Sequence, residues 1–222
     1  MKPLFVYTAI VGEFSDSLAP IEVPTDRRRR PVRYVCFSDR DMTCPSGWEL
    51  RPATFNHVEP RRAARWHKIM SHLLFADAQF TLWHDGSHHL KVNPWDVIDD
   101  SLSGDREFAT FKHPMRDCIY EETQACLQLK KDAPGRLLEQ AERYSQEGYP
   151  AGEGLFETSC IARRNSAAVA GLNDLWWREI QRSSCRDQIS LPYVIWKLNF
   201  AQLAVLSGNG TDSAYFTFRP HR

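Results

Sequence analysis

The sequence lacks both a net charge and a long hydrophobic run. Its 28 lysines and arginines are balanced by 28 aspartates and glutamates, so no overall charge favours nucleic acid or an anionic membrane as a partner. No run approaches the roughly 20 apolar residues that span a bilayer. The opening "MKPLFVYTAIVGEF" has only a short apolar run and no small-residue cleavage site of a signal peptide. We therefore expect a soluble cytoplasmic protein, with no nucleic-acid partner and no transmembrane segment.

One run of like charge stands out, "DRRRRP" at 26–31. A run of this length is typical of a solvated loop, and a patch for nucleic acid or another anionic surface is the alternative.

The sequence also lacks the cysteine spacings of metal ribbons and redox motifs. Its six cysteines never form a Cys-x-x-Cys pair. Cys36 in "YVCFSD" and Cys160 in "TSCIARR" lie inside apolar runs, where cysteine usually acts as a small buried hydrophobe. We expect a reduced protein without structural disulfides.

Apolar runs and helical patterns alternate along the chain. Strands are predicted at 4–12, 32–39, 80–86, 107–114 and 154–165, and helices at 59–75, at 119–150 with a break at "DAPG", at 166–184 and at 187–199 with an interruption at Pro192. This alternation favours an α/β fold with a mainly parallel central sheet flanked by helices.

No repeat or linker divides the chain, so we predict a single domain over residues 1–222. A first half at about 1–92 and a second half at about 93–205 are followed by a polar tail at 206–222, which we expect to be irregular.

Three predicted strands end in polar side chains that can take part in chemistry: Asp39, Asp85 and His113. Ligands of open α/β sheets bind beyond the carboxyl ends of the strands, so we expect these three residues to open onto one cleft. The alternative is that they are ordinary polar turn residues.

The stretch "LWHDGSHHLK" is the most suggestive of these strand ends. Asp85 offers the hard oxygen ligand that Mg²⁺ or Mn²⁺ shares with substrate phosphates, and Gly86 lets a ligand approach the backbone. Ser87 stands where a second carboxylate would complete an Asp-x-Asp pair, and His89 is a candidate nitrogen ligand that favours manganese. A turn with surface histidines remains the alternative.

Two helical segments carry further candidates. Basic residues surround the apolar face of the helix predicted at 59–75, where they either clamp phosphates or form a solvated face: Arg61, Arg62, Arg65 and Lys68. Asp187 and Gln188 begin the helix predicted at 187–199. Asp187 is either a helix cap or first-turn acid or, with Gln188, part of a pair that orients sugar hydroxyls and stabilises positive charge on an anomeric carbon.

Taken in order, the blocks from about Leu4 to Lys197 resemble the glycosyltransferase-like domain of unknown function found in bacteria and in plant proteins linked to mucilage and turgor. The blocks are "YTAIVGEFSDSL", "YVCFSD", "GW", "RRAARWHKIMSHLLF", "LWHDGSHHLK", "FKHPMRDCIYEE", "EGYP", "GLFETSCIARRN", "WWREI" and "RDQISLPYVIWK". Their order is also similar to that of GT-A type transferases, especially retaining galactosyl- and xylosyltransferases.

The resemblance implies a nucleotide-sugar site. Tyr7, Thr8, Ala9 and Asp39 would contact the base and ribose, with Arg65 and Lys68 near the diphosphate. Asp85 matches the first position of the Asp-x-Asp motif, followed by Gly86 and Ser87, and His113 belongs to the signature on the same side. The catalytic group would be Asp187, Gln188 and Glu157. The metal ligands would be Asp85 with His89 and, in place of the family's late histidine, His221.

The implied function is transfer of a sugar from a nucleotide-diphosphate donor, most readily a UDP-sugar, to a hydroxyl of a glycan, polysaccharide or small acceptor, with Mn²⁺ or Mg²⁺ as the cofactor. Two alternatives stay open. A metal-dependent hydrolase would gather Asp85, His88, His89 and His113 around one ion. A non-catalytic carbohydrate-binding protein would keep the fold without turnover.

Overall fold

The computed structural model describes residues 2–13 and 18–218. Within these residues a seven-stranded sheet has the order β3-β2-β1-β4-β7-β6-β8. The strands are β1 (Leu4–Ile10), β2 (Val32–Ser38), β3 (Trp48–Pro52), β4 (Phe80–His84), β6 (Phe108–Lys112), β7 (Phe156–Arg164) and β8 (Leu203–Leu206). Only β7 runs antiparallel to its neighbours β4 and β6, so the sheet is mainly parallel as the sequence predicts.

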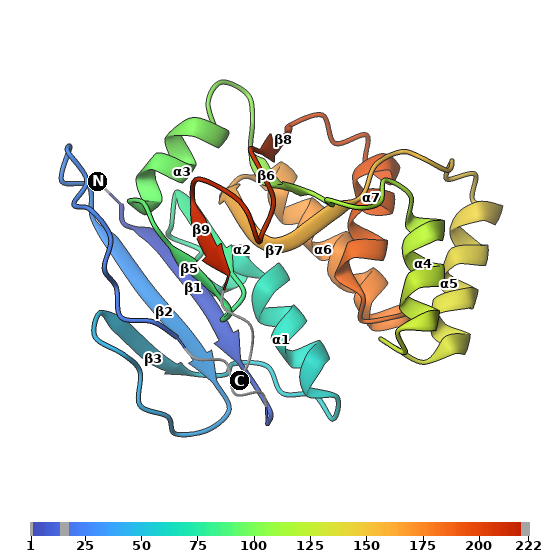
Figure 1. Cartoon of the computed structure of the whole chain (residues 1–222), viewed down its shortest axis with the longest axis horizontal. Helices are drawn as coiled ribbons and strands as arrows, with labels where there is room; N and C mark the ends of the chain where they lie inside the picture. The colour runs from blue at the N-terminus through green and yellow to red at the C-terminus, as the bar shows by residue number, and fades with distance from the viewer. Residues whose placement is uncertain (1, 14–17, 219–222) are drawn as a thin grey trace.

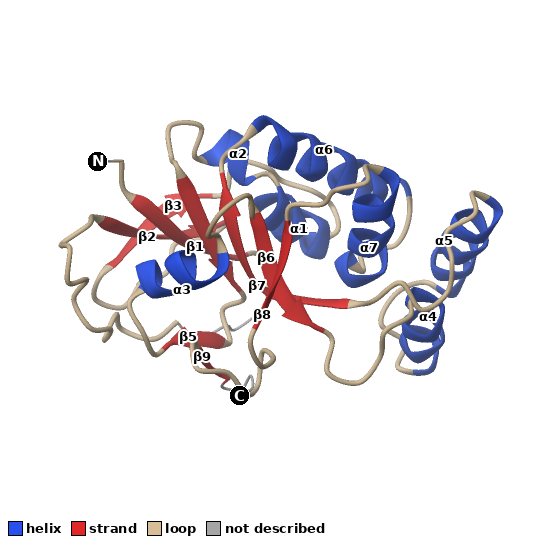
Figure 2. Ribbon diagram, turned by 90° about the horizontal axis from the view of Figure 1, so that it is seen from above, coloured by secondary structure: helices blue, strands red, loops and turns tan. Residues whose placement is uncertain are grey.

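Helices cover one face of this sheet (Figure 2). They are α1 (Pro60–Ile69), α2 (Ser71–Leu74), α6 (Ala167–Arg182) and α7 (Asp187–Lys197), with α4 (Ile119–Gln128) and α5 (Pro134–Gln146) packed beyond α7 at one end. The core on this side joins both halves of the chain, since Tyr7 and Phe37 of the first half share one buried cluster with Trp176 and Ile189 of the second. The two halves therefore fold around a common sheet.

The other face is covered by α3 (Pro94–Ser101) and by a small ribbon of β5 (His88–Leu90) and β9 (Phe216–Phe218) (Figure 1). Trp95 and Ile98 of α3 and Phe216 of β9 pack there against apolar side chains of the sheet. The segment that we expected to be an irregular tail thus contains β9. It pairs antiparallel with β5, three residues after Asp85, because Phe216 supplies the apolar anchor.

Two helix predictions need correction. The helix expected over 59–75 breaks at Met70, whose φ of −84° and ψ of 40° separate α1 from α2. The helix α7 runs from Asp187 to Lys197 without interruption at Pro192. Proline forfeits one backbone hydrogen bond there, while the surrounding residues from Ile189 to Val194 stay buried. Packing outweighs the local cost.

The arginine run is only partly solvated. Arg27, Arg28 and Arg29 are exposed, but Arg30 is largely covered and forms ion pairs with Asp26 at 3.0 Å and with Asp99 of α3 at 2.7 Å. This pairing ties the loop before β2 to α3.

The six cysteines form no disulfide, and all of them lie within the described residues. Cys36 and Cys160 are fully buried in β2 and β7, as their apolar surroundings predict. No helix in the described part of the chain is long and apolar enough to cross a membrane.

Candidate functional site

A cavity of about 340 Å³ opens at the carboxyl ends of β1 and β4. Its floor is the end of β1, Ala9 to Val11, and the turn after β4, Asp85 to Ser87. One wall is α1, through Arg61, Ala64 and Arg65. Lys131, which lies between α4 and α5, meets this wall, since Arg61 donates to its backbone carbonyl at 3.0 Å. Cys185 and Arg186, which precede α7, complete the lining. This is the edge at which open α/β sheets bind their ligands.

Basic residues outnumber acidic ones in the lining of the cavity. Four cationic residues, Arg61, Arg65, Lys131 and Arg186, face a single acidic one, Asp85. They come from three separate segments of the chain, so the fold gathers charges that the neutral overall composition conceals. A cavity with this balance favours an anionic ligand such as a phosphate group.

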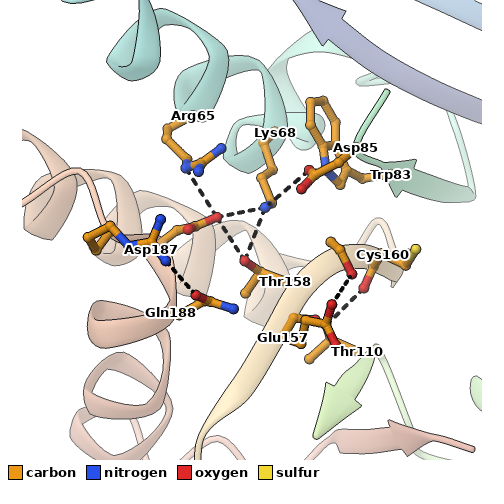
Figure 3. A network of polar contacts seen from close by, with 12 residues as sticks. Arg65, Lys68, Trp83, Asp85, Thr110, Glu157, Thr158, Cys160, Asp187 and Gln188 are labelled. Carbon is orange, nitrogen blue, oxygen red and sulfur yellow. Dashed lines mark hydrogen bonds and ion pairs between the residues drawn. The ribbon is translucent and has the colours of Figure 1, made fainter. Parts of the chain in front are cut away.

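Behind the cavity, Lys68 of α1 lies between two carboxylates (Figure 3). Its Nζ is 2.6 Å from Oδ2 of Asp187 and 3.4 Å from Oδ1 of Asp85, and it donates to the hydroxyl of Thr158 at 3.0 Å. Thr158 in turn donates to Asp187 at 2.8 Å. Lys68 and Asp187 are 1% and 3% exposed, so this ion pair is buried and fully bonded. We call Lys68, Asp85, Thr158 and Asp187 the lysine cluster.

Asp187 is held in its charged form by this environment. Burial alone raises the pKa of its carboxyl, but Arg65, Lys68 and Arg186 outweigh burial and keep the pKa far below its usual range. Arg65, which lines the cavity, lies 3.3 Å from the same carboxylate oxygen through its Nε. Asp187 itself does not line the cavity. It therefore contacts the ligand site through Lys68 and Arg65.

Asp187 is an acidic residue of the first turn of α7, as one of the alternatives predicts, and the interpretation as a helix cap is wrong. Arg186 occupies the cap position of α7, and Asp187 is the first helical residue, with its side chain turned to Lys68 and Thr158. The helix start still helps, because the amides of its first turn favour a carboxylate.

The loop before α7 is fastened from the α4–α5 turn. Asp132 accepts hydrogen bonds from the hydroxyl of Ser184 at 2.7 Å and from the backbone amide of Cys185 at 2.8 Å. Arg186 then donates to Gln188 at 2.8 Å and lies 3.6 Å from the buried carboxylate of Glu122. These contacts aim Arg186 at the cavity. Gln188 thus supports Arg186, and it does not line the cavity itself.

The three residues of β1 that were predicted to contact the nucleotide do not all reach the cavity. Ala9 lines the cavity. Tyr7 and Thr8 are fully buried, and the hydroxyl of Tyr7 donates to the backbone carbonyl of Lys68 at 3.0 Å. Tyr7 thereby braces the helix turn that carries Lys68, which favours a structural role over contact with a nucleotide.

Asp39, Asp85 and His113 do not share one cleft. Asp39 accepts a hydrogen bond from the amide of Gly12 at 2.9 Å and lines a separate hollow with Arg40 and Asp41. His113 follows β6 and accepts from the amide of Arg116 at 3.1 Å, within a group that includes Glu122. All three strands end at the same edge, but β7 lies between β4 and β6 and separates His113 from the cavity.

Glu157 on β7 also lies outside the cavity lining. Its carboxylate accepts from the hydroxyl of Ser159 at 3.2 Å and from the amide of Gly210 at 3.0 Å. A Cβ at position 210 would lie 2.3 Å from that carboxylate, so only glycine allows this approach. Glu157 fixes the segment that leads to β9.

The predicted metal ligands are scattered. Asp85 lines the cavity, but His89 belongs to β5 and lines a different hollow with His84 and His88. Burial lowers the pKa of His84 to about 4. His221 lies outside the described residues. Within the described residues no three His, Cys, Asp or Glu side chains are grouped as a metal site requires.

The basic face of α1 has two functions. Arg65 and Arg61 line the cavity, but Arg62 is 4% exposed and donates to the backbone carbonyls of Ile180 and Ser183 at the end of α6. Arg62 therefore holds two helices together. Arg65 was predicted as a site residue from the sequence, but Lys131 and Arg186 were not. Spacing along the chain does not reveal that the loops of these two residues meet α1.

Comparison with known proteins gives three findings. A family model described as "TOD1/MUCI70, glycosyltransferase-like domain" matches residues 51–208 of this chain. A probable hexosyltransferase, MUCI70 of Arabidopsis thaliana, is 28% identical over 148 residues, which cover 62% of this chain and 25% of the plant protein. The chain thus spans about a quarter of the length of that relative.

The apo structure of the bifunctional glycosyltransferase WbbM is similar in fold. The two structures superpose with a TM-score of 0.51 at 10% sequence identity, over 92% of this chain and 38% of that one. The matched segment 51–208 contains all four residues of the lysine cluster and the whole cavity lining except Ala9, Ile10 and Val11 of the β1 end. The chain is a member of the TOD1/MUCI70 glycosyltransferase-like family.

Proposed function

We propose that the protein transfers a hexosyl group from a nucleotide-diphosphate donor to a hydroxyl of a glycan or small acceptor. The observation that carries this proposal is the basic cavity at the carboxyl ends of β1 and β4, in a chain of a glycosyltransferase-like family. The name of the plant relative supports a hexose as the transferred sugar. A UDP-sugar is the first donor class to test.

The chemistry fits the charges of the cavity. In the transfer, the bond from the anomeric carbon to the diphosphate oxygen breaks, the acceptor oxygen bonds to that carbon, and the acceptor proton leaves to water. Negative charge grows on the departing diphosphate. Arg65 and Arg186 line the cavity and are held by Asp187 and Gln188, and preorganised charges of this kind supply a large share of catalysis. Lys131 adds a third positive charge to the lining.

In this proposal Asp187 is a positioning residue. It fixes Lys68 and Arg65 beside the cavity through contacts of 2.6 and 3.3 Å. Its own carboxylate is buried beneath them, so it acts on the ligand by holding these two cations in place.

The hydrolase alternative has less support. It needs Asp85, His88, His89 and His113 to converge on one ion, but His88 and His89 line a different hollow from Asp85 and His113 lies beyond β7. Nothing in the arrangement of these side chains favours that reaction.

A panel of nucleotide sugars tests the proposal. A donor that binds the folded state raises the melting temperature in a saturable way, by mass action. We expect UDP-sugars to raise it in the wild type and in Arg178→Gln, an exposed change on α6 outside the cavity, but much less in Arg65→Gln. If no nucleotide sugar shifts the wild-type melting curve, the proposed function is wrong.

A further inference from the structure

We propose that this site binds the diphosphate of its donor without a divalent cation, and that arginine and lysine side chains take over the neutralising role of the metal. The inference rests on the proposed function and goes against the Mn²⁺ or Mg²⁺ that the family resemblance implies. It is derived from the ligands that the fold offers near the cavity.

A metal between carboxylates needs oxygens whose charge is not yet neutralised. Asp85 is the one acidic residue that lines the cavity, and its Oδ1 already accepts from the indole of Trp83 at 2.9 Å and lies 3.4 Å from Lys68. Asp187, the other carboxylate of the lysine cluster, has Lys68 at 2.6 Å and Arg65 at 3.3 Å. Both carboxylates are therefore already paired with cations of the chain.

The ammonium group of Lys68 stands at the place that a bridging ion would take. It lies between Asp85 and Asp187, is 1% exposed, and is also bonded to Thr158 (Figure 3). A divalent ion on the same Asp85 oxygen would approach this buried positive charge, and two cations a few ångströms apart repel each other, less strongly on the cavity side, where Asp85 is 36% exposed. The lysine cluster disfavours a metal by charge.

The remaining ligands of a metal site do not fit either. An Asp-x-Asp pair would have its second carboxylate at position 87, which carries a serine here. The hydroxyl of Ser87 lies 3.3 Å from Nδ1 of His88. His84, His88 and His89 line a different hollow from Asp85. Magnesium and manganese bind through one or two carboxylates together with substrate phosphates. The one carboxylate in the cavity lining is Asp85, which already faces Lys68 at 3.4 Å.

The cavity instead carries the charges that a diphosphate requires. Arg61, Arg65, Lys131 and Arg186 line it, from α1, the α4–α5 turn and the loop before α7. Arginine binds phosphate oxygens through a planar fork with two parallel hydrogen bonds, and lysine adds a point charge. Arg65 and Arg186 lie 3.3 and 3.6 Å from the buried carboxylates of Asp187 and Glu122. With Lys68 included, five cations stand against the three carboxylates of Asp85, Asp187 and Glu122, so these side chains leave a positive balance with no ion added.

The experiment is a calorimetric titration with two probes, UDP and inorganic pyrophosphate, each in EDTA and in Mn²⁺. Pyrophosphate carries no sugar or base, so it isolates the phosphate contacts. We expect dissociation constants in EDTA and in Mn²⁺ that agree within about twofold. Tenfold or tighter binding in Mn²⁺ would overturn the inference and leave the proposed function standing. If neither probe binds in either buffer, both the inference and the proposed function fail.

The variant Asp85→Asn should change phosphate affinity in opposite directions in a metal-dependent site and in a metal-free site. A metal ligand that is lost weakens binding in Mn²⁺ by a large factor. In a metal-free site the change removes the one negative charge beside the phosphates, while Oδ1 remains an acceptor for Trp83. We expect pyrophosphate in EDTA to bind about two- to fivefold more tightly, in keeping with one unit charge at a partly solvated distance.

Weaker binding of pyrophosphate to folded Asp85→Asn in EDTA contradicts the inference. If Asp85→Asn does not fold, as judged by its melting curve, the comparison of EDTA with Mn²⁺ on the wild type decides alone. Lys131→Gln is the companion variant, since it should weaken pyrophosphate equally in both buffers. Loss that appears in EDTA but not in Mn²⁺ would show that the ion, and not the side chain, bears the phosphate charge when the ion is present.

Discussion

Two ion networks of the helical layer can be compared, and within the described residues one of them borders the basic cavity while the other does not. The lysine cluster joins Lys68 to Asp187 at 2.6 Å, and its member Asp85 and the neighbouring Arg65 line the basic cavity. At the other end of the helical layer, Arg143 of α5 pairs with Glu179 of α6 at 2.6 Å, and Tyr144 donates to the same carboxylate at 2.7 Å. Neither Arg143 nor Glu179 lines the basic cavity.

The difference shows that a buried charge does not by itself mark a functional site. The Arg143–Glu179 pair has its partners within the protein, including the hydroxyl of Ser183, and it joins α5 to α6. The lysine cluster has the same chemistry but places cations beside open space. What separates the two networks is access to a ligand, so paired variants can test each assignment.

The largest effect is expected for Asp187→Asn, matched by Glu179→Gln in the other network. Removing one partner of a buried ion pair leaves the other charge uncompensated, and each variant should lose about 3 kcal/mol of unfolding free energy. Turnover should fall roughly 10²-fold only in Asp187→Asn, because Lys68 and Arg65 lose their anchor beside the cavity. Urea denaturation and donor turnover per folded molecule measure both quantities.

Equal turnover in Asp187→Asn and Glu179→Gln would show that the two networks are alike and purely structural. A turnover loss in Glu179→Gln alone would place the site at the wrong end of the molecule.

The next effect concerns acid. The lowered pKa of Asp187 means that its stabilising contribution is complete above the pKa of the unfolded chain, about 3.9, and is lost as pH falls toward the folded value. The stability gap between wild type and Asp187→Asn should therefore be constant above about pH 5 and shrink by about 1 kcal/mol for each pH unit below about 3.9. Denaturation midpoints of both proteins at pH 7, 5 and 3 measure this gap, and a gap that does not change with pH argues against a charged Asp187.

The smallest effect is expected from two adjacent lysines. Lys131 lines the cavity, whereas Lys130 is exposed and does not. Lys131→Gln should raise the KM for the donor about threefold, as expected for one solvent-exposed charge facing a phosphate, and Lys130→Gln should leave it unchanged. Identical kinetics in the two variants would remove the α4–α5 turn from the binding site.

Local pattern was enough to predict the main elements of the sheet and most helices. The runs that form β1, β2, β4, β6 and β7 are apolar and bounded by turn residues, so their period shows directly in the sequence. Helix α3 was missed although its signal is present. Asn93 caps the amide of Trp95, and Pro94 occupies the first helical position, a combination that begins many helices.

Strands β5 and β9 could not be predicted in the same way. Each has three residues, and β9 is defined by its pairing with β5 more than a hundred residues earlier in the chain. A segment this short carries no period of its own, so only the tertiary contact makes it a strand.

Single residues of the site were predictable from the sequence, but the contacts between its segments were not. Asp85 and Arg65 follow from a strand end and a basic helix. The bond between Lys68 and Asp187 joins α1 to α7, and the approach of Lys131 and Arg186 to α1 depends on how α4 to α7 pack. Such contacts leave no local trace in the sequence. For the same reason a helix cap and a buried ion partner could not be distinguished at position 187.

The most direct test of sugar transfer by this protein is product analysis by mass spectrometry, with a UDP-hexose donor and a panel of hydroxyl acceptors. We expect the wild type to form UDP and a new glycoside in equal amounts, in EDTA as well as in Mn²⁺. The yield from Asp187→Asn should be roughly 10²-fold lower. Free hexose in place of the glycoside, with water as the only acceptor, would contradict the assignment of the basic cavity to sugar transfer.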